Sequence, residues 1–191
     1  MTRLLIVGPP GSGKGTQAAR ITDQLGVVAI STGDIFRANV KEMTPLGVEA
    51  KKYMDSGDYV PDSVTNAMVR DRLAQEDVAD GFLLDGYPRT VAQVAELDDI
   101  LSSNGQSLDA VVLLTADEDE LVARLLNRAQ TEGRADDTED VIRHRLNVYT
   151  EQTQDVVAAY RERGLVREVD GLGELDEVTG RIMSVLKSST V

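Results

Sequence analysis

The chain lacks cysteine, has far fewer basic than acidic residues and contains a single histidine. Without cysteine it can form no disulfide and no cysteine-ligated zinc site, which fits a reducing compartment. The chain has 20 Lys and Arg residues and 33 Asp and Glu residues, so its formal net charge is −13. A surface this acidic argues against nucleic-acid or anionic-membrane partners, because both require a basic footprint.

Long hydrophobic runs are also missing. The first apolar run, Leu4 to Val7, is too short for the core of a signal peptide and far too short to span a bilayer. We therefore expect a cytoplasmic protein. The 191 residues suffice for one α/β domain with a full core and a small insertion, and they contain no internal repeat or low-complexity tract.

Short apolar runs predict the strands of a parallel sheet. Most are continuous rather than alternating, as is typical of strands buried on both faces. They span residues 4–7, 27–30, 82–84, 110–114 and 165–169. Segments with helical spacing lie between them, at 17–25, 62–75, 90–101, 117–128, 138–163 and 174–186. This alternation predicts a three-layer α/β/α fold with a five-stranded parallel sheet and a ligand crevice at the carboxyl ends of the strands.

Two segments interrupt the alternation. Residues 31–60 contain two helical stretches, 33–40 and 45–56, with no strand predicted between them, which indicates a small helical insertion. Residues 129–138 are a short polar stretch with one glycine, which we interpret as a link between two helices.

The glycine-rich loop from Gly8 to Thr16 is the most informative segment, and it separates the first predicted strand from the first predicted helix. Its glycines let several backbone N–H groups point at one anion, while Lys14 and the helix N-terminus add positive charge. The loop follows most of the phosphate-binding pattern G-x-x-x-x-G-K-[ST]. Gly15 departs from that pattern, because the hydroxyl comes one residue later. The loop predicts binding of nucleoside phosphates and leaves open whether its hydroxyl ligates Mg²⁺ directly.

A second polar motif begins where the second predicted strand ends. Ser31 or Thr32 can cap the helix that follows, and we expect Arg37, about one turn into it, to point back towards the crevice. The same pattern also fits an ordinary capped helix without a ligand.

A third motif begins at Asp85, directly after the third predicted strand. A carboxylate at a strand tip beside a phosphate-binding loop is placed to act on Mg²⁺. Gly86 permits close backbone approach, Pro88 fixes the turn, and Arg89 offers a guanidinium fork suited to phosphate. Gln93, four residues later on one helix face, could hydrogen-bond to a base edge. The competing interpretation is a glycine–proline turn with a surface arginine.

Arginine makes up 15 of the 20 basic residues, and several arginines bracket the 129–138 stretch. Arg124 and Arg128 share a helix face, whereas Arg143 and Arg145, two residues apart, cannot face the same way. Together with Arg134 they fit either a phosphate clamp or a solvated face of ion pairs. Solvated helix-face positions are expected for five further arginines: Arg70, Arg72, Arg161, Arg163 and Arg181.

In this order the motifs resemble the adenylate kinase family over essentially the whole chain. The resemblance rests on Gly-Pro-Pro-Gly-Ser-Gly-Lys-Gly-Thr-Gln at 8–17, Ser-Thr-Gly-Asp at 31–34, Leu-Asp-Gly-Tyr-Pro-Arg-Thr at 84–90 and Gly-Arg-Ala-Asp-Asp at 133–137. In this family the loop reads Gly-Lys-Gly-Thr, so Gly15 departs from the general phosphate-binding pattern but agrees with the family's version of it. The resemblance implies reversible, Mg²⁺-dependent phosphoryl transfer from ATP to AMP, giving two ADP, and a role in adenine nucleotide homeostasis.

The resemblance also implies roles for matching residues. The ATP-binding set is Gly11, Ser12, Gly13, Lys14, Gly15, Thr16, Arg124, Arg128 and Gly173, with Arg124 and the Gly173 backbone against adenine. The AMP-binding set is Thr32, Arg37, Asp58, Tyr59, Val60, Gly86, Tyr87, Pro88, Arg89, Gln93, Arg134 and Arg145. The catalytic charges are Lys14, Arg89, Arg128, Arg134 and Arg145. Asp85 is implied to hold Mg²⁺ through water.

The implied organisation is a single kinase domain with two substrate-covering parts. Its core is 1–30, 61–127 and 139–191, its AMP-binding insertion is 31–60, and its lid is 128–138. Only residues 129–133 lie where long-lid members of the family insert a larger segment, sometimes one that holds zinc, so no structural zinc is expected. We expect the insertion and the lid to close over the substrates and exclude water.

Alternative functions remain open at this point. A pyrimidine nucleoside monophosphate kinase, acting on UMP or CMP, also has a short lid, although Thr32 and Gln93 together favour adenine. A non-catalytic nucleotide-binding module should have lost Lys14 or a clamp arginine, and none is missing. A GTPase-type switch would require an Asn-Lys-x-Asp motif, and the sequence has no Asn-Lys pair. Phosphoryl transfer needs no imidazole base, so we expect His144 to be a solvated helix residue. A monomer is expected because no long exposed apolar stripe is evident.

Overall fold

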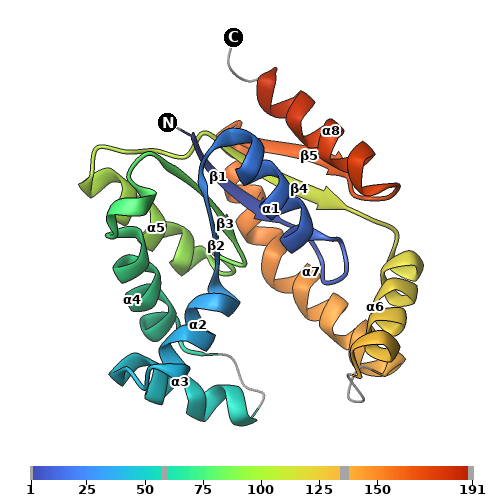
Figure 1. The fold of residues 1–191 in the computed structure, drawn as a ribbon, viewed down its shortest axis with the longest axis horizontal. Coiled ribbons are helices and arrows are strands. Elements are labelled where there is room, and N and C mark those ends of the chain that lie inside the picture. Colours follow the sequence, from blue (N-terminus) through green and yellow to red (C-terminus); the bar gives the residue numbers. More distant parts are fainter. Residues whose placement is uncertain (1, 57–59, 134–137, 189–191) are drawn as a thin grey trace.

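The structure, a computed structural model, describes residues 2–56, 60–133 and 138–188, along which strands and helices alternate except where α2, α3 and α4, and later α6 and α7, follow one another (Figure 1). The strands are β1 (Thr2–Val7), β2 (Val28–Ser31), β3 (Gly81–Asp85), β4 (Ala110–Thr115) and β5 (Val166–Asp170). The helices are α1 (Lys14–Leu25), α2 (Thr32–Lys41), α3 (Pro45–Ser56), α4 (Asp62–Leu73), α5 (Val91–Ser103), α6 (Glu118–Glu132), α7 (Glu139–Glu162) and α8 (Leu175–Lys187). The sheet order β2-β3-β1-β4-β5, with parallel pairing throughout, confirms the predicted α/β fold.

The sheet divides the core into two hydrophobic clusters, because successive strand residues point to opposite faces. Leu5 and Leu84 belong to the cluster that packs under α4, α5 and α7. Leu4 and Leu83 belong to the other, which packs under α1 and α8. Burying one such side chain fully stabilises the fold by about 1.5–3 kcal/mol. Both faces of the sheet are therefore covered, which explains why the apolar runs are continuous.

Local capping residues set several helix boundaries. The Thr90 side chain accepts the backbone N–H of Gln93 at the start of α5 (3.2 Å), and Asp117 accepts that of Glu120 at the start of α6 (3.2 Å). Gly26, with φ 66°, ends α1 in the left-handed region that favours glycine. These caps keep the loops after β3 and β4 at fixed positions relative to the sheet.

The prediction for residues 129–138 is wrong in part. Residues 129–132 continue α6, and the helix ends only at Gly133, with φ 67°. Ala, Gln and Glu are good helix formers, whereas glycine is the usual residue at a helix C-terminus. The described part of the segment between Arg128 and Arg134 is therefore helical, and the link itself is shorter than the sequence suggested.

Two pairs of helices flank the sheet at its carboxyl edge. Figure 1 shows α2 and α3 extending from one side, and α6 with the start of α7 extending from the other. α6 and α7 pack through the buried side chains of Leu121, Leu125, Ile142 and Leu146. Of the helices that the structure describes, none is both long and apolar enough to cross a membrane.

Candidate active site

The three polar motifs meet at the carboxyl edge of the sheet because of the strand register. Asp85, the last residue of β3, pairs with Ile6 of β1 on one side and with Ser31 of β2 on the other. The glycine-rich loop begins two residues after Ile6, and α2 begins directly after Ser31. Parallel strands thus bring the loops after β1, β2 and β3 together at the switch point where β3 and β4 flank β1.

The glycine-rich loop forms a hollow lined by backbone groups. Gly11 and Gly13 have φ 81° and φ 86°, and Gly13 is the N-cap of α1. The first N–H groups of a helix have no acceptor within it, and the first turn of α1 contains no acidic residue. A Cβ added at Gly13 or Gly15 would meet no described atom within 4 Å. The loop therefore offers open space, unused donors and a positive helix end to an anion.

Lys14 folds back over this loop and lies among charged neighbours. Its Nζ donates to the carbonyls of Gly8 (2.8 Å) and Pro9 (3.4 Å). Burial lowers the pKa of Lys14, the nearby carboxylate of Asp85 raises it, and the positive charges of Arg89 and Arg128 lower it further. Burial likewise raises the pKa of Asp85, against the opposing effects of Lys14 and Arg89. Burial thus disfavours the charged form of both groups, a cost that a bound phosphate or cation would offset.

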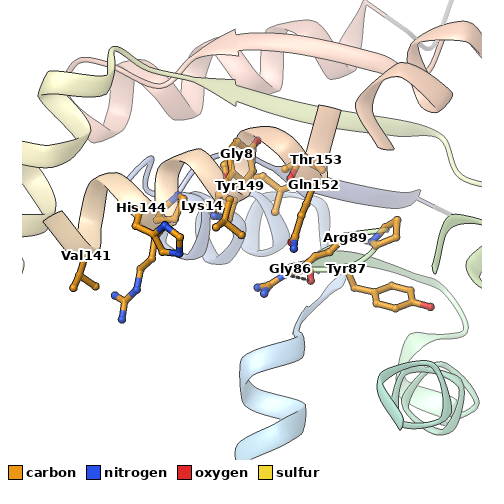
Figure 2. A pocket seen from close by; sticks show the side chains of 16 residues that line it. Gly8, Lys14, Gly86, Tyr87, Arg89, Val141, His144, Tyr149, Gln152 and Thr153 are labelled. Carbon is orange, nitrogen blue, oxygen red and sulfur yellow. Dashed lines mark hydrogen bonds between the residues drawn. The ribbon is translucent and has the colours of Figure 1, made fainter. Parts of the chain in front are cut away.

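A cavity of about 460 Å³ lies beside the loop and collects three of the predicted catalytic charges, Lys14, Arg89 and Arg145. They come from three separate elements: the glycine-rich loop with α1, the loop after β3, and α7. Figure 2 shows Lys14 and Arg89 directed towards this hollow, with the Arg89 side chain donating to the Gly86 carbonyl (2.9 Å). Gly86, Tyr87 and Pro88 line the cavity as well. Cations from distant parts of the chain therefore converge on one solvent-accessible space.

One wall of the cavity is a face of α7 from which the sequence analysis assigned only Arg145 to the site. Val141, His144, Tyr149 and Gln152 of α7 line the cavity (Figure 2). Burial raises the pKa of Tyr149 to about 12, so its phenol remains a hydrogen-bond donor. The i, i+4, i+7 spacing from Arg145 could have identified this face. His144 is exposed, as expected, but it borders the cavity rather than open surface alone.

The predicted AMP-side residues contact one another around the loop after β3. Buried Thr32 donates its hydroxyl to the Gly86 carbonyl (3.3 Å), which ties α2 to this loop. Gln93, only 5% exposed, accepts the backbone N–H of Arg89 (2.7 Å). Val60 is half-buried against the core. Three other predicted site residues, Asp58, Tyr59 and Arg134, lie outside the described residues.

The side-chain capping expected of the second motif is wrong. Ser31 occupies the N-cap of α2 but makes no side-chain capping bond, and Thr32 uses its hydroxyl on Gly86 instead. Arg37 pairs with Asp34 on the surface of α2, and its side chain is 68% exposed. The guanidinium also lies back against the start of α2, because a Cβ added at Gly33 would be 3.3 Å from it, so the orientation of Arg37 towards the crevice stays a prediction.

The arginines around the α6–α7 link have different surroundings: some pair with surface carboxylates, and one lines the cavity. Arg143 forms ion pairs with Glu118, Asp119 and Glu139 at 3.0–3.3 Å, away from the cavity. Arg145, two residues later, lines the cavity. Arg128 lies close enough to Lys14 to lower its pKa.

Farther along α6, Arg124 is half-buried and pairs with Glu120 (3.4 Å). All five arginines predicted to be solvated form surface ion pairs: Arg70, Arg72, Arg161, Arg163 and Arg181.

Arg181 does more than the solvated role predicted for it. Its guanidinium donates to the carbonyls of Asp170 (3.1 Å) and Leu172 (2.5 Å), and so braces the loop that leads to Gly173. A Cβ added at Gly171 would lie 3.5 Å from the Ser12 carbonyl, so this loop runs directly beside the phosphate-binding loop. No local pattern in the sequence indicates these contacts, because they join α8 to a turn nine or more residues earlier.

The carboxylates near the site show how a metal ion could be held. The described residues contain no group of three or more His, Cys, Asp or Glu side chains arranged to hold one. Asp85 is the carboxylate at the strand tip beside Lys14, and it is partly buried. Mg²⁺ is commonly held by one or two carboxylates together with substrate phosphates and waters, so a lone carboxylate here fits a metal that arrives with a nucleotide.

The sequence matches the family model described as adenylate kinase over residues 6–165. It is 71% identical over 187 residues to an adenylate kinase of Kocuria rhizophila, covering 98% of this chain and 100% of that protein. It is 72% identical over 186 residues to an adenylate kinase of Renibacterium salmoninarum, covering 97% and 96% of the two chains. An adenylate kinase of Pseudarthrobacter chlorophenolicus is 68% identical over 189 residues, covering 99% and 98%.

Proposed function

The chain belongs to the adenylate kinase family, and from that premise we propose how its residues divide the work of phosphoryl transfer from ATP to AMP. The glycine-rich loop, residues 11–16, binds the phosphates of ATP, and the loop after β3 with Thr32, Val60 and Gln93 binds AMP. Lys14, Arg89, Arg128 and Arg145 supply positive charge where the phosphoryl group passes between them.

The observation that carries this proposal is the convergence of Lys14, Arg89 and Arg145 on one cavity. In phosphoryl transfer the attacking and leaving oxygens are roughly in line, and negative charge spreads over the three equatorial oxygens of the transferred phosphoryl group. Little covalent work is required of the protein, so catalysis comes from positioning and from fixed positive charge. Cations from three elements around one space suit that task.

The donor and acceptor nucleotides approach this space from opposite sides. The phosphate-binding loop and the Asp170–Gly173 turn lie together, which suits ATP phosphates at the loop and adenine against the turn and Arg124. α2 and the loop after β3 lie on the other side of Lys14, joined by the Thr32–Gly86 hydrogen bond. An oxygen of the AMP phosphate then attacks the γ-phosphoryl group across the cavity, and ADP leaves from each side.

Asp85 would hold Mg²⁺ through water at the strand tip. The ion, when bound with ATP, neutralises charge on the β- and γ-phosphates. The chain's own contribution is to keep a carboxylate there despite its burial, with Lys14 and Arg89 opposing the rise in its pKa.

Arg143 and Arg145 provide a matched test of the phosphate clamp. Arg145→Met is expected to lower kcat by about 10³-fold or more, the effect of removing an arginine that stabilises this transition state. Arg143→Met removes an arginine of the same helix whose partners lie outside the cavity, so its kcat should stay within about twofold. Equal turnover in the two variants would contradict the assignment of Arg145.

Substrate choice separates this function from its nearest alternative. Phosphoryl transfer from ATP should be much faster with AMP than with CMP, UMP or GMP, and should require Mg²⁺. A preference for CMP or UMP would identify a pyrimidine nucleoside monophosphate kinase instead. Binding of nucleotides without any transfer would identify a non-catalytic module.

We extend the proposal to the working state of the enzyme. We propose that the enzyme works as a monomer, because Lys14, Arg89 and Arg145 already meet at the cavity within a single chain. The lid, residues 128–138, and the insertion, residues 31–60, close over the substrates, since water near the γ-phosphoryl group would turn transfer into ATP hydrolysis. The cytoplasm is the proposed location, because a chain without cysteine suits a reducing compartment.

A further inference from the structure

We propose that Asp62 determines the base specificity of the monophosphate site by fixing the orientation of the Gln93 side-chain amide. Asp62 is the first residue of α4, directly after Pro61, and it lies 31 positions before Gln93 in the chain. The inference rests on the proposed function, in which Gln93 contacts the base of AMP.

Asp62, Thr90 and Gln93 form a closed hydrogen-bond network beneath the loop after β3. The Gln93 Nε2 donates to Asp62 Oδ1 (2.8 Å), and Gln93 Oε1 accepts the backbone N–H of Arg89 (2.7 Å). The Thr90 hydroxyl donates to Asp62 Oδ2 (3.1 Å) and accepts the backbone N–H of Gln93 (3.2 Å). Both carboxylate oxygens of Asp62 are therefore engaged by the first turn of α5 and its cap.

This network permits only one orientation of the amide. A carboxylate only accepts hydrogen bonds, and a backbone N–H only donates them. If the amide of Gln93 rotated by half a turn, its oxygen would face Asp62 and its NH₂ would face the N–H of Arg89. Both hydrogen bonds would become repulsive contacts, and Gln93 is too deeply buried, at 5% exposure, for water to replace them readily.

A fixed amide has a fixed donor and a fixed acceptor left for a ligand. After the two contacts, Nε2 retains one hydrogen and Oε1 retains one lone pair. Adenine presents an N–H donor and a ring-nitrogen acceptor side by side, and a glutamine amide pairs with such an edge through two hydrogen bonds. Guanine and hypoxanthine present the reverse order, an oxygen acceptor beside a ring N–H donor. With the amide locked, only the adenine order fits at a given placement of the ribose.

Asp62 is thus a positioning residue that acts on the base through Gln93. Without it, the amide can turn and pair with either kind of base edge, so selectivity falls while Gln93 remains in place. A purely structural role for Asp62 predicts something else: weaker binding of all monophosphates, with their ratio unchanged. The ratio of kcat/KM for AMP to that for IMP separates these two roles.

The experiment compares this ratio in wild type, Asp62→Leu, Asp62→Asn and Gln93→Leu. We expect Asp62→Leu to lower the AMP/IMP ratio by about tenfold or more, because a site that no longer fixes its polar groups stops rejecting the mismatched edge. Asp62→Asn keeps the shape of the side chain and should lower the ratio in the same direction but less, since an asparagine amide can face either end of Gln93. If thermal melting shows that Asp62→Leu does not fold, the AMP/IMP ratio of Asp62→Asn tests the proposal in its place.

Asp71→Asn serves as the matched control. It makes the same charge change at an exposed position of the same helix, and its AMP/IMP ratio should equal that of wild type. If both Asp62 variants keep the wild-type ratio while Gln93→Leu loses it, the proposal for Asp62 is overturned and the role of Gln93 stands. If Gln93→Leu also keeps the ratio, Gln93 does not contact the base, and the proposed AMP site itself fails.

Discussion

Gly86 is the residue at which a single added methyl group should disturb both stability and AMP binding. It stands between β3 and Arg89, with φ 86°, in the left-handed region where a side chain is strained. A Cβ at this position would lie 2.5 Å from Oγ1 of Thr32, whereas ordinary van der Waals contacts begin at 3.4 Å. Gly86→Ala therefore forces either the loop after β3 or Thr32 on α2 to move by several tenths of an ångström.

The expected cost has two parts. The left-handed backbone costs about 1–2 kcal/mol for a residue with a Cβ. Overpacking against buried Thr32, which is 4% exposed, adds about 1–3 kcal/mol. Gly86→Ala should thus lower the free energy of unfolding by about 2–5 kcal/mol. Because the hydrogen bond from Thr32 to the Gly86 carbonyl is displaced, KM for AMP should rise while KM for ATP changes little.

Chemical denaturation and steady-state kinetics check both parts. Gly105→Ala is the matched control, because Gly105 has φ 65° but no described atom within 4 Å of an added Cβ, so it reports the backbone term alone. The Thr32→Ala background removes the contact, and there Gly86→Ala should cost no more than Gly105→Ala. If Gly86→Ala and Gly105→Ala were equally destabilising in the wild-type background, the steric argument would be refuted.

Two further predictions concern the ATP side of the site. Arg181→Met should raise KM for ATP several-fold and leave KM for AMP nearly unchanged, because the guanidinium braces the carbonyls of Asp170 and Leu172 beside the phosphate-binding loop; equal changes for both nucleotides in steady-state assays would contradict this. Burial lowers the pKa of Lys14 below 10.5, so its ammonium form, present below that pKa, is lost at a lower pH than in a free lysine. Calorimetry should show Mg²⁺-free ADP binding weaken with a midpoint at a lower pH than the titration of a free lysine, and Lys14→Arg should abolish the decline, since arginine stays charged; a midpoint at or above that of a free lysine would refute the shift.

The features that local physics determines could be predicted from the sequence. Apolar runs identified all five strands. Burial on both faces leaves no polar position in the runs of β1, β3 and β4, whereas β5, at the edge of the sheet, includes the partly buried Arg167 and the exposed Glu168. The glycine-rich loop could be assigned because its glycines, lysine and following helix are consecutive in sequence. The end of α6 was misplaced although Gly133 is a readable stop signal, since the polar residues before it were taken for a link.

Features that depend on tertiary contacts could not be predicted in the same way. Helical spacing shows that Arg145, Tyr149 and Gln152 share a face of α7, but not that this face lines a cavity rather than a core. Arg181 looks like any surface arginine in the sequence, because its partners are carbonyls presented by a turn on another element. Asp62 likewise gave no signal of its contact with Gln93, which α4 and α5 make only by packing side by side.

The charge distribution of the cavity explains how so acidic a protein can bind nucleotides. The net charge of −13 belongs to the whole chain, whereas Asp85, Arg89 and Arg128 all lie close enough to Lys14 at the phosphate-binding loop to shift its pKa. Burial is the main cause of the lowered pKa of Lys14, and repulsion from Arg89 and Arg128 adds a smaller effect, so the charged form of Lys14 opposes the folded state when no nucleotide is bound. A bound polyphosphate offsets that repulsion and replaces the lost hydration. Relief of these two unfavourable terms adds to the free energy of nucleotide binding. The acidic surface does not counteract this locally, because charges more than about 8–10 Å away through solvent are screened at physiological ionic strength.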